Sequence, residues 1–131
     1  MTVIGAAGGM ITYAVGGWNS ALTTLVIFMA VDYITGIIVA GVFHNSNKTE
    51  EGTLESRAGF KGLCKKAVML LCVLMGYRLD VTMGTNIVKD GVTIAFIANE
   101  ALSIIENAGL MGVPMPETIK NAVAALKNTE K

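Results

Sequence analysis

The residues best suited to chemistry in this sequence lie in one apolar stretch near its C-terminal end. Between Phe96 and Gly109 the chain is mostly apolar, yet it carries two carboxylic acids, two amides and a hydroxyl group. These polar residues are Asn99, Glu100, Ser103, Glu106 and Asn107. Two carboxylates can form an acid–base pair for hydrolysis, or they can hold protons and cations along a path through a membrane. The elements that position them have to decide between these chemistries.

The spacing of the five polar residues sorts them onto one side of a helix. At about 100° per residue, all five fall within an arc of about 120°. In a membrane such a stripe faces a bundle interior, another subunit or water, because lipid exposure costs about 2.5–3.5 kcal/mol per residue at mid-membrane. A soluble amphipathic helix would instead turn the stripe to solvent. The stripe therefore predicts a pore lining or an inter-subunit surface if the segment spans a membrane.

The amino-acid composition is more typical of a membrane protein than of a soluble domain. The chain has 131 residues, enough for one domain, with 53% hydrophobic residues and a mean hydropathy of +0.59. Charged residues make up 15%, against about 25% in a typical soluble domain. The formal net charge is +0, and no aromatic-basic pattern suggests nucleic-acid binding.

Enzymatic function is not expected. The sequence has no Ser-His-Asp set, no metal-type spacing of His or Cys, and no glycine motif that would cradle a phosphate. Cys64 and Cys72 have no partner histidine nearby, and we interpret both as small apolar residues. His44 is expected in a loop. We therefore predict no cofactor and no metal site.

Hydrophobic runs outline an all-α membrane protein with about three transmembrane helices and an N-terminal interfacial or partly inserted helix. The strongest span, Ala21–Phe43, contains a single charged residue, Asp32. Residues 67–77 are apolar but short, and reach spanning length only if Lys65, Lys66 and Arg78 snorkel to the headgroups. The expected elements of the single domain 1–131 are an N-terminal helix at 1–18, spans at 20–43, 63–80 and 91–113, a loop at 44–62 and a tail at 117–131.

The distribution of Lys and Arg gives an orientation. Five such residues lie between 44 and 66, two between 78 and 91, and three in the tail. Because cytoplasmic loops are enriched in Lys and Arg, the long loop and the C-terminus are predicted to be cytoplasmic, and the protein multi-pass. Uncharged residues 2–18, with Trp18 at headgroup depth, are favoured as an interfacial helix, although a short span is the alternative.

Three acids at membrane depth, Asp32, Glu100 and Glu106, have no evident buried Lys or Arg partner in the sequence. Such acids need water or hydrogen bonds from neighbours. Three helices of one protomer cannot enclose a wide polar interior by themselves, so we expect a homo-oligomer. Asp32 is either a lumen residue or an intramembrane hydrogen-bond partner. The residues expected in helix packing are Thr35, Gly36 and Ala40.

Four segments resemble a known family. They are "VDYITGIIVA" (31–40), "GFKGLCKKAVMLL" (59–71), Asp80 of "YRLD", and "IANEALSIIENAGLMGVPMPETIK" (97–120). Together they resemble the phage holin family that includes clostridial toxin-secretion holins, over about residues 18–127. The positions that match the family pattern are Asp32, Gly36, Gly59, Lys61, Gly62, Lys66, Asp80, Asn99, Glu100, Ser103, Glu106, Asn107 and Pro116. The loop that starts at His44 is longer than the connector typical of the family.

The resemblance implies a small protein of the bacterial inner (cytoplasmic) membrane that assembles with itself into lesions. Through these lesions a phage endolysin, or in some relatives a secreted toxin, leaves the cytoplasm and the host cell lyses. The implied partners are membrane lipid, further copies of the chain and, functionally, the endolysin or toxin. Two other functions stay open. One is a small ion channel or transporter that uses the intramembrane carboxylates, and the other is a scaffold whose loop at 44–66 recruits a soluble partner.

Overall fold

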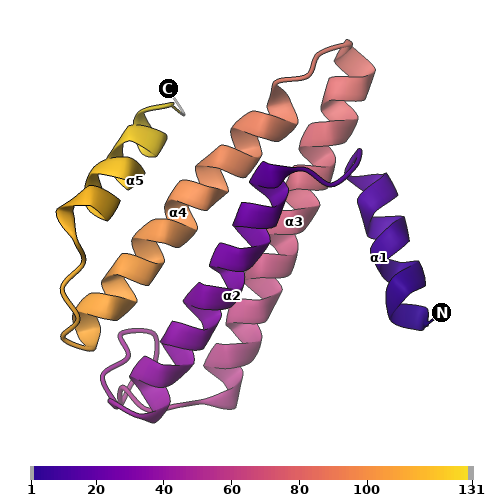
Figure 1. Ribbon diagram of the computed structural model, residues 1–131. Helices are drawn as coiled ribbons and strands as arrows, with labels where there is room; N and C mark the ends of the chain where they lie inside the picture. The colour runs from indigo at the N-terminus through magenta and orange to yellow at the C-terminus, as the bar shows by residue number, and fades with distance from the viewer. Residues whose placement is uncertain (1, 130–131) are drawn as a thin grey trace.

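A computed structural model describes residues 2–129, and these form an all-helical structure (Figure 1). This confirms the predicted all-α class. The helices are α1 (Val3–Ala14), α2 (Ser20–Gly41), α3 (Ser56–Met83), α4 (Val88–Leu110) and α5 (Glu117–Thr129). Residue 1 of the expected N-terminal helix and residues 130 and 131 of the expected tail lie outside the described residues.

Local signals set the helix ends. The side chain of Asn19 accepts a hydrogen bond from the Leu22 amide at 2.9 Å and caps the start of α2. Gly84 ends α3 in the left-handed conformation, with φ of 70°, and its amide donates to the Asp80 carbonyl. Downstream of α4, Pro114 and Pro116 separate that helix from α5.

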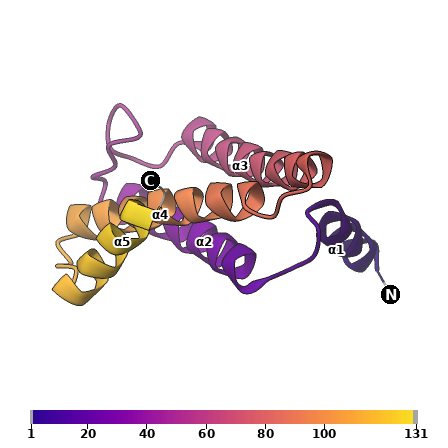
Figure 2. The same ribbon diagram turned by 90° about the horizontal axis from the view of Figure 1, so that it is seen from above.

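Helix α4 is the centre of the bundle. It packs between α2 and α3, as the view from above shows (Figure 2), and α2 touches α3 much less. Helix α5 folds back along α4 (Figure 1). Towards the start of α2, the helices share an apolar core. This core consists of Val15, Leu22, Leu25, Met29, Val73 and Ile97. Leu126 of α5 packs against it, so the C-terminal helix is docked on the bundle.

The close crossing of α3 and α4 depends on Gly76. A Cβ at this position would lie 3.2 Å from the Lys89 Cα, closer than nearly all real contacts of this kind. Gly76 therefore lets the two backbones approach near the α3–α4 turn. Asp80, in the last turn of α3, lies beside the α3–α4 turn, and its role is described below.

Helix α1 stands apart from the bundle as an arm. It has no buried residue and lies beside α3, connected to α2 by the linker at residues 15–19 (Figures 1 and 2). The linker itself contacts the bundle, because Val15 is buried and Lys89 Nζ donates a hydrogen bond to the Gly17 carbonyl at 3.1 Å. Whether α1 crosses or lies on the membrane stays a prediction.

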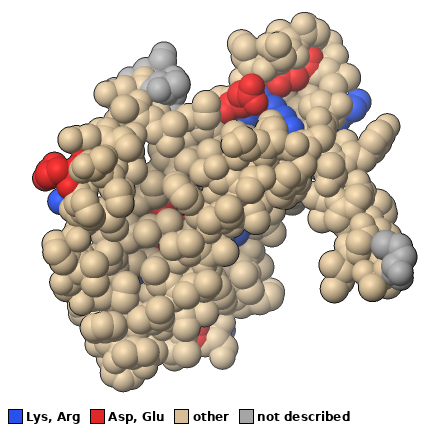
Figure 3. Space-filling model, in the orientation of Figure 1, with Lys and Arg blue, Asp and Glu red and all other residues tan. Residues whose placement is uncertain are grey.

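Within the described residues, α2 is the one helix that is both long and apolar enough to cross a membrane by itself. Its visible face in the space-filling view is largely free of charge (Figure 3). Helices α3 and α4 are long enough but carry more charges, so their insertion stays a prediction. Helix α3 begins at Ser56, inside the stretch expected as a loop at 44–62, which adds a basic start to the expected span at 63–80.

Candidate functional site

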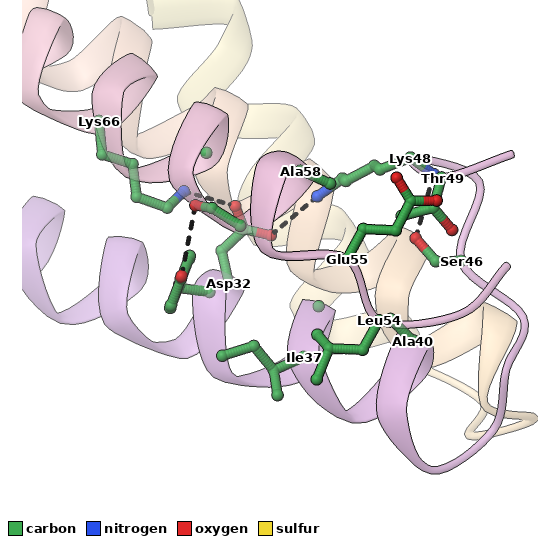
Figure 4. Close-up of a pocket in the computed structure, with 14 residues that line it drawn as sticks. Asp32, Ile37, Ala40, Ser46, Lys48, Thr49, Leu54, Glu55, Ala58 and Lys66 are labelled. Carbon is green, nitrogen blue, oxygen red and sulfur yellow. Dashed lines mark hydrogen bonds and ion pairs between the residues drawn. The ribbon is translucent and has the colours of Figure 1, made fainter.

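A buried ion cluster joins the three long helices near their middles. Asp32 of α2 and Glu100 of α4 are 4% and 3% exposed. Lys66 of α3 reaches between them, and its Nζ lies 2.7 Å from Asp32 Oδ2 and 2.7 Å from Glu100 Oε1. Figure 4 shows Lys66 extending from its helix toward Asp32. One ammonium group thus bridges two carboxylates.

The second oxygen of Asp32 is bound by α4. Ser103 Oγ donates to Asp32 Oδ1 at 2.6 Å, and Asn107 Nδ2 donates to the same oxygen at 3.0 Å. Asn107 Nδ2 also lies 2.8 Å from Thr35 Oγ1. We call this set the polar cluster; its members are Asp32, Thr35, Lys66, Glu100, Ser103 and Asn107.

The polar cluster holds two acids and one base, and a second base lies at its edge. Lys48 Nζ, from the loop between α2 and α3, is 4.0 Å from Asp32 Oδ1, with its side chain 51% exposed. An exposed pair of this kind contributes about 0–1 kcal/mol. The buried ion pairs of Lys66 therefore provide most of the compensation. Removing one member of such a buried group costs about 3–5 kcal/mol, because the remaining charge stays buried without a partner.

The expectation that the deep acids have no basic partner in the chain is wrong for Asp32 and Glu100, as is the expectation that Lys66 snorkels. Gly59 and Gly62 of α3 lie against Tyr33 of α2. Lys66 follows at helical spacing on the same face, so it points inward, whereas Lys65 is exposed. The Gly59, Gly62, Lys66 spacing was the sequence signal for this contact. The family resemblance also included Lys66.

The predicted stripe on α4 is divided between two surfaces. Glu100 and Asn107 are buried and Ser103 is partly buried, whereas Asn99 and Glu106 are exposed. The arc of about 120° is wide enough to straddle the edge of the buried face of α4. Glu100, Ser103 and Asn107 are bound inside the bundle, so the predicted inter-subunit or pore-lining role is most open for the two exposed residues.

The two glutamates do not form a hydrolytic pair at one site. Glu100 binds Lys66 inside the bundle, whereas Glu106 accepts a hydrogen bond from Asn47 of the loop at 2.7 Å. Within residues 2–129, no group of three or more His, Cys, Asp or Glu side chains is arranged to hold a metal ion.

The residues predicted to pack α2 against another helix lie at contacts inside this chain. Thr35 bonds Asn107, and a Cβ on Gly36 would lie 3.9 Å from the Asn107 amide nitrogen. Ala40 is 4% exposed. A crevice of about 90 Å³ opens beside them, between α2, the loop and the first turns of α3 (Figure 4). Asp32 and Lys66 are among its lining residues, so the polar cluster borders this opening.

Asp80 is a structural residue to which the sequence assigned no role. Its carboxylate accepts hydrogen bonds from the Val88 and Lys89 amides, both at 2.9 Å, and from Thr85 Oγ1 at 2.6 Å. It therefore caps α4 from the end of α3. The family resemblance was the one signal that singled it out.

Comparison with known proteins places this architecture in a family. The model of the bacteriophage holin family matches residues 9–128. An uncharacterised protein of Listeria monocytogenes is 35% identical over 88% of this chain and 78% of its own length. An uncharacterised protein of Clostridium perfringens is 35% identical over 92% and 87%. A protein of Bacillus phage phi105 named a probable holin is 32% identical over 82% and 74%.

No solved structure matches the chain. The family match nevertheless covers nearly all of the sequence, including every member of the polar cluster and the cap residue Asp80. Members of this family are membrane proteins without enzymatic activity. The chain therefore belongs to the bacteriophage holin family.

Proposed function

We propose that this protein is a holin that assembles from many copies into lesions in the bacterial cytoplasmic membrane. The lesions release an endolysin, or a toxin in the same manner, and lead to lysis of the host cell. The observation that carries the proposal is the family match over residues 9–128, and the phage relative named a probable holin supports it. A membrane-length apolar helix, α2, fits this role.

The proposed topology has three crossings, by α2, α3 and α4. The loop between α2 and α3 and the C-terminus lie in the cytoplasm, and α1 lies in the interface or is partly inserted. The polar cluster supports insertion of α3 and α4, because it pairs Lys66 and Glu100 with Asp32 rather than leaving them toward lipid.

A lesion requires more than one copy of the chain. The interior of one protomer is filled by the apolar core and the polar cluster, so it leaves no room for a passage wide enough for a protein. Many large apolar side chains are also exposed on α2 and α3, among them Ile34 at 55% and Leu71 at 60%. Such surfaces are suited to lipid and to further copies of the chain.

The test is controlled expression in a bacterial host together with a cytosolic muralytic enzyme. Culture density, membrane potential and the release of the enzyme are followed after induction. We expect a delay, then sudden depolarisation with enzyme release. Growth at constant potential, with the protein shown to be in the membrane, would contradict the holin function. Replacing the muralytic enzyme by a large secreted toxin tests the second cargo.

An ion channel or transporter is the second candidate, and the Asp32–Lys66–Glu100 cluster is the observation that favours it. Alternating acids and bases in a membrane can relay protons. This function predicts saturable ion flux in vesicles at low protein density, without release of entrapped macromolecules. A holin instead releases both ions and macromolecules once its lesions form.

A further inference from the structure

The exposed face of α3 changes from basic to apolar along the helix. Arg57, Lys61 and Lys65 are exposed and follow one another at four-residue intervals, so they lie on one side within about 80°. None of them forms an ion pair with the residues that the structure describes. Further along, the exposed residues of α3 are mostly apolar; examples are Val68, Leu71 and Met75.

Contacts between the helices fix the level of this basic face relative to α2. Tyr33 Oη donates to the Gly59 carbonyl at 3.3 Å, and a Cβ on Gly62 would lie 3.7 Å from the Tyr33 ring. Leu54, just before α3, lies against Gly41 at the end of α2. The basic turns of α3 therefore run beside the second half of α2.

The second half of α2 has the opposite character. Its outward residues there include Ile34, 55% exposed, and Ile37, 40% exposed. Helix α2 has 22 residues, and a bilayer core of about 30 Å requires about 20 residues of helix. If α2 crosses the membrane, it needs nearly its whole length, including this second half. The basic face of α3 is then carried to hydrocarbon depth beside it.

Cationic side chains at that depth cannot all face lipid. Each costs about 2.5–3.5 kcal/mol at the centre of a membrane helix. Snorkelling can relieve a residue at the helix end, but Arg57, Lys61 and Lys65 extend over more than two turns. The interior of the bundle offers no alternative, because the acids there are already paired with Lys66. Water on the outer side of α3 satisfies all three charges.

Building on the proposed holin function, we propose that the exposed face of α3 around Arg57, Lys61 and Lys65 lines the water-filled lumen of the lesion. The apolar face of α2 at the same level meets lipid. The wall of the lesion is then cationic and attracts small anions. This assigns the lumen to a face of α3 rather than to the buried members of the α4 stripe.

Cysteine labelling tests this assignment, because a maleimide needs a hydrated thiolate. The chain has two cysteines, and Cys64 is exposed beside Lys61 and Lys65. In the Cys72→Ala protein Cys64 is the sole cysteine. The matched control carries Cys64→Ala, Cys72→Ala and Ile34→Cys, which places the thiol on the outward face of α2. Circular dichroism confirms that both proteins keep their helices.

Both proteins are reconstituted in phospholipid vesicles loaded with a dextran dye and treated with a charged, membrane-impermeant maleimide. The lesions admit the reagent to both sides of the membrane, so sidedness does not affect the result. We expect Cys64 to react at about its rate in detergent, and the cysteine at position 34 to react about tenfold more slowly. Dye release reports the lesion in the same vesicles.

Each other outcome overturns the inference in a recognisable way. Rapid labelling at both positions would place the second half of α2 outside the bilayer. Slow labelling at both positions would show that lipid or protein covers the α3 face, which contradicts the lumen assignment. If dye is released in the same vesicles, the holin function is still supported. Labelling of Cys64 without dye release would contradict both the lumen and the holin function in this membrane.

Discussion

Lys66 is the residue at which the charges of three helices meet. Its ammonium lies 2.7 Å from a carboxylate of α2 and 2.7 Å from a carboxylate of α4. Asp32 depends on it but has other donors in Ser103 and Asn107, whereas for Glu100 no other donor is found among the described residues. The members of the polar cluster are therefore unequal, and substitutions should separate them.

The substitution Lys66→Met keeps a side chain of similar length and removes its positive charge. Two carboxylates then stay buried without a base, so we expect a loss of stability of about 3–5 kcal/mol. Thermal and denaturant unfolding in mild detergent, followed by circular dichroism, measures it. The matched control is Lys65→Met on the neighbouring exposed position, for which a change within about 0.5 kcal/mol is expected. Equal losses for the two variants would show that the Lys66 ion pairs contribute nothing.

Among the acids, Asp32→Asn should be more damaging than Glu100→Gln. Asp32 accepts hydrogen bonds from three side chains of α3 and α4, and Glu100→Gln leaves the Lys66–Asp32 pair intact. We expect the unfolding midpoint to fall further for Asp32→Asn. The surface control is Glu106→Gln, which should leave the midpoint almost unchanged.

The same acids connect stability with lesion timing. Glu100→Gln and Glu106→Gln together should shift the onset of lysis while leaving insertion intact, and the single variants show which acid is responsible. Host depolarisation after induction is the measurement. If depolarisation begins at the same time after induction in the double variant as in the unchanged protein, the α4 stripe has no part in lesion formation.

At the scale of the elements, α4 is positioned by its neighbours more than by its own sequence. Its own N-cap residue, Ile87, supplies no side-chain hydrogen bond. Asp80 of α3 binds the first amides of α4 instead. Gly76 brings the two helices close enough for this. The α3–α4 turn is therefore one structural unit.

Asp80→Ala should loosen the first turn of α4. The Val88 and Lys89 amides lose their acceptor, and we expect their hydrogen exchange to become about tenfold faster. Exchange measured by mass spectrometry on peptides covering residues 85–95 tests this. Asp90→Ala is the control, since Asp90 is an exposed acid in the same turn. Exchange that is unchanged in Asp80→Ala would contradict the cap.

For the whole molecule, the main division is between a packed bundle and the α1 arm. The linker between α1 and α2 is held by Lys89, whose Nζ donates to the Gly17 carbonyl and lies 5.8 Å from the Tyr77 ring centroid. Gly16, with φ of +81°, sits against the same ring, where a Cβ would clash. These contacts set where the arm leaves the bundle.

Lys89→Met should release the linker while keeping the backbone amide that Asp80 caps. Trp18, the only tryptophan in the sequence, is next to the lost contact. Trp18 is 49% exposed in the structure. We expect its fluorescence to be quenched more readily by acrylamide, because the freed linker exposes the rest of the indole. Lys127→Met on α5 is the control. Identical quenching in the two variants would show that Lys89 does not hold the linker.

The sequence by itself determined the helical class, the approximate position of each long helix and the resemblance to the holin family. Hydrophobic runs and helix-ending residues such as Pro114 are local signals, and they persist whatever the chain packs against. The sequence also located Asp32 and Glu100 as acids that need partners.

Only the tertiary structure decided what those partners are. Lys66 and Lys65 are adjacent and chemically identical, so their own side-chain chemistry does not say which one turns inward. Lys66 points inward because Gly59 and Gly62 on the same face of α3 pack against Tyr33 of α2, a contact between residues far apart in the chain. For the same reason the stripe on α4 could be placed on one side of its helix, but not divided into Glu100 inside and Glu106 outside. Which arc of a helix is buried depends on the neighbours that cover it.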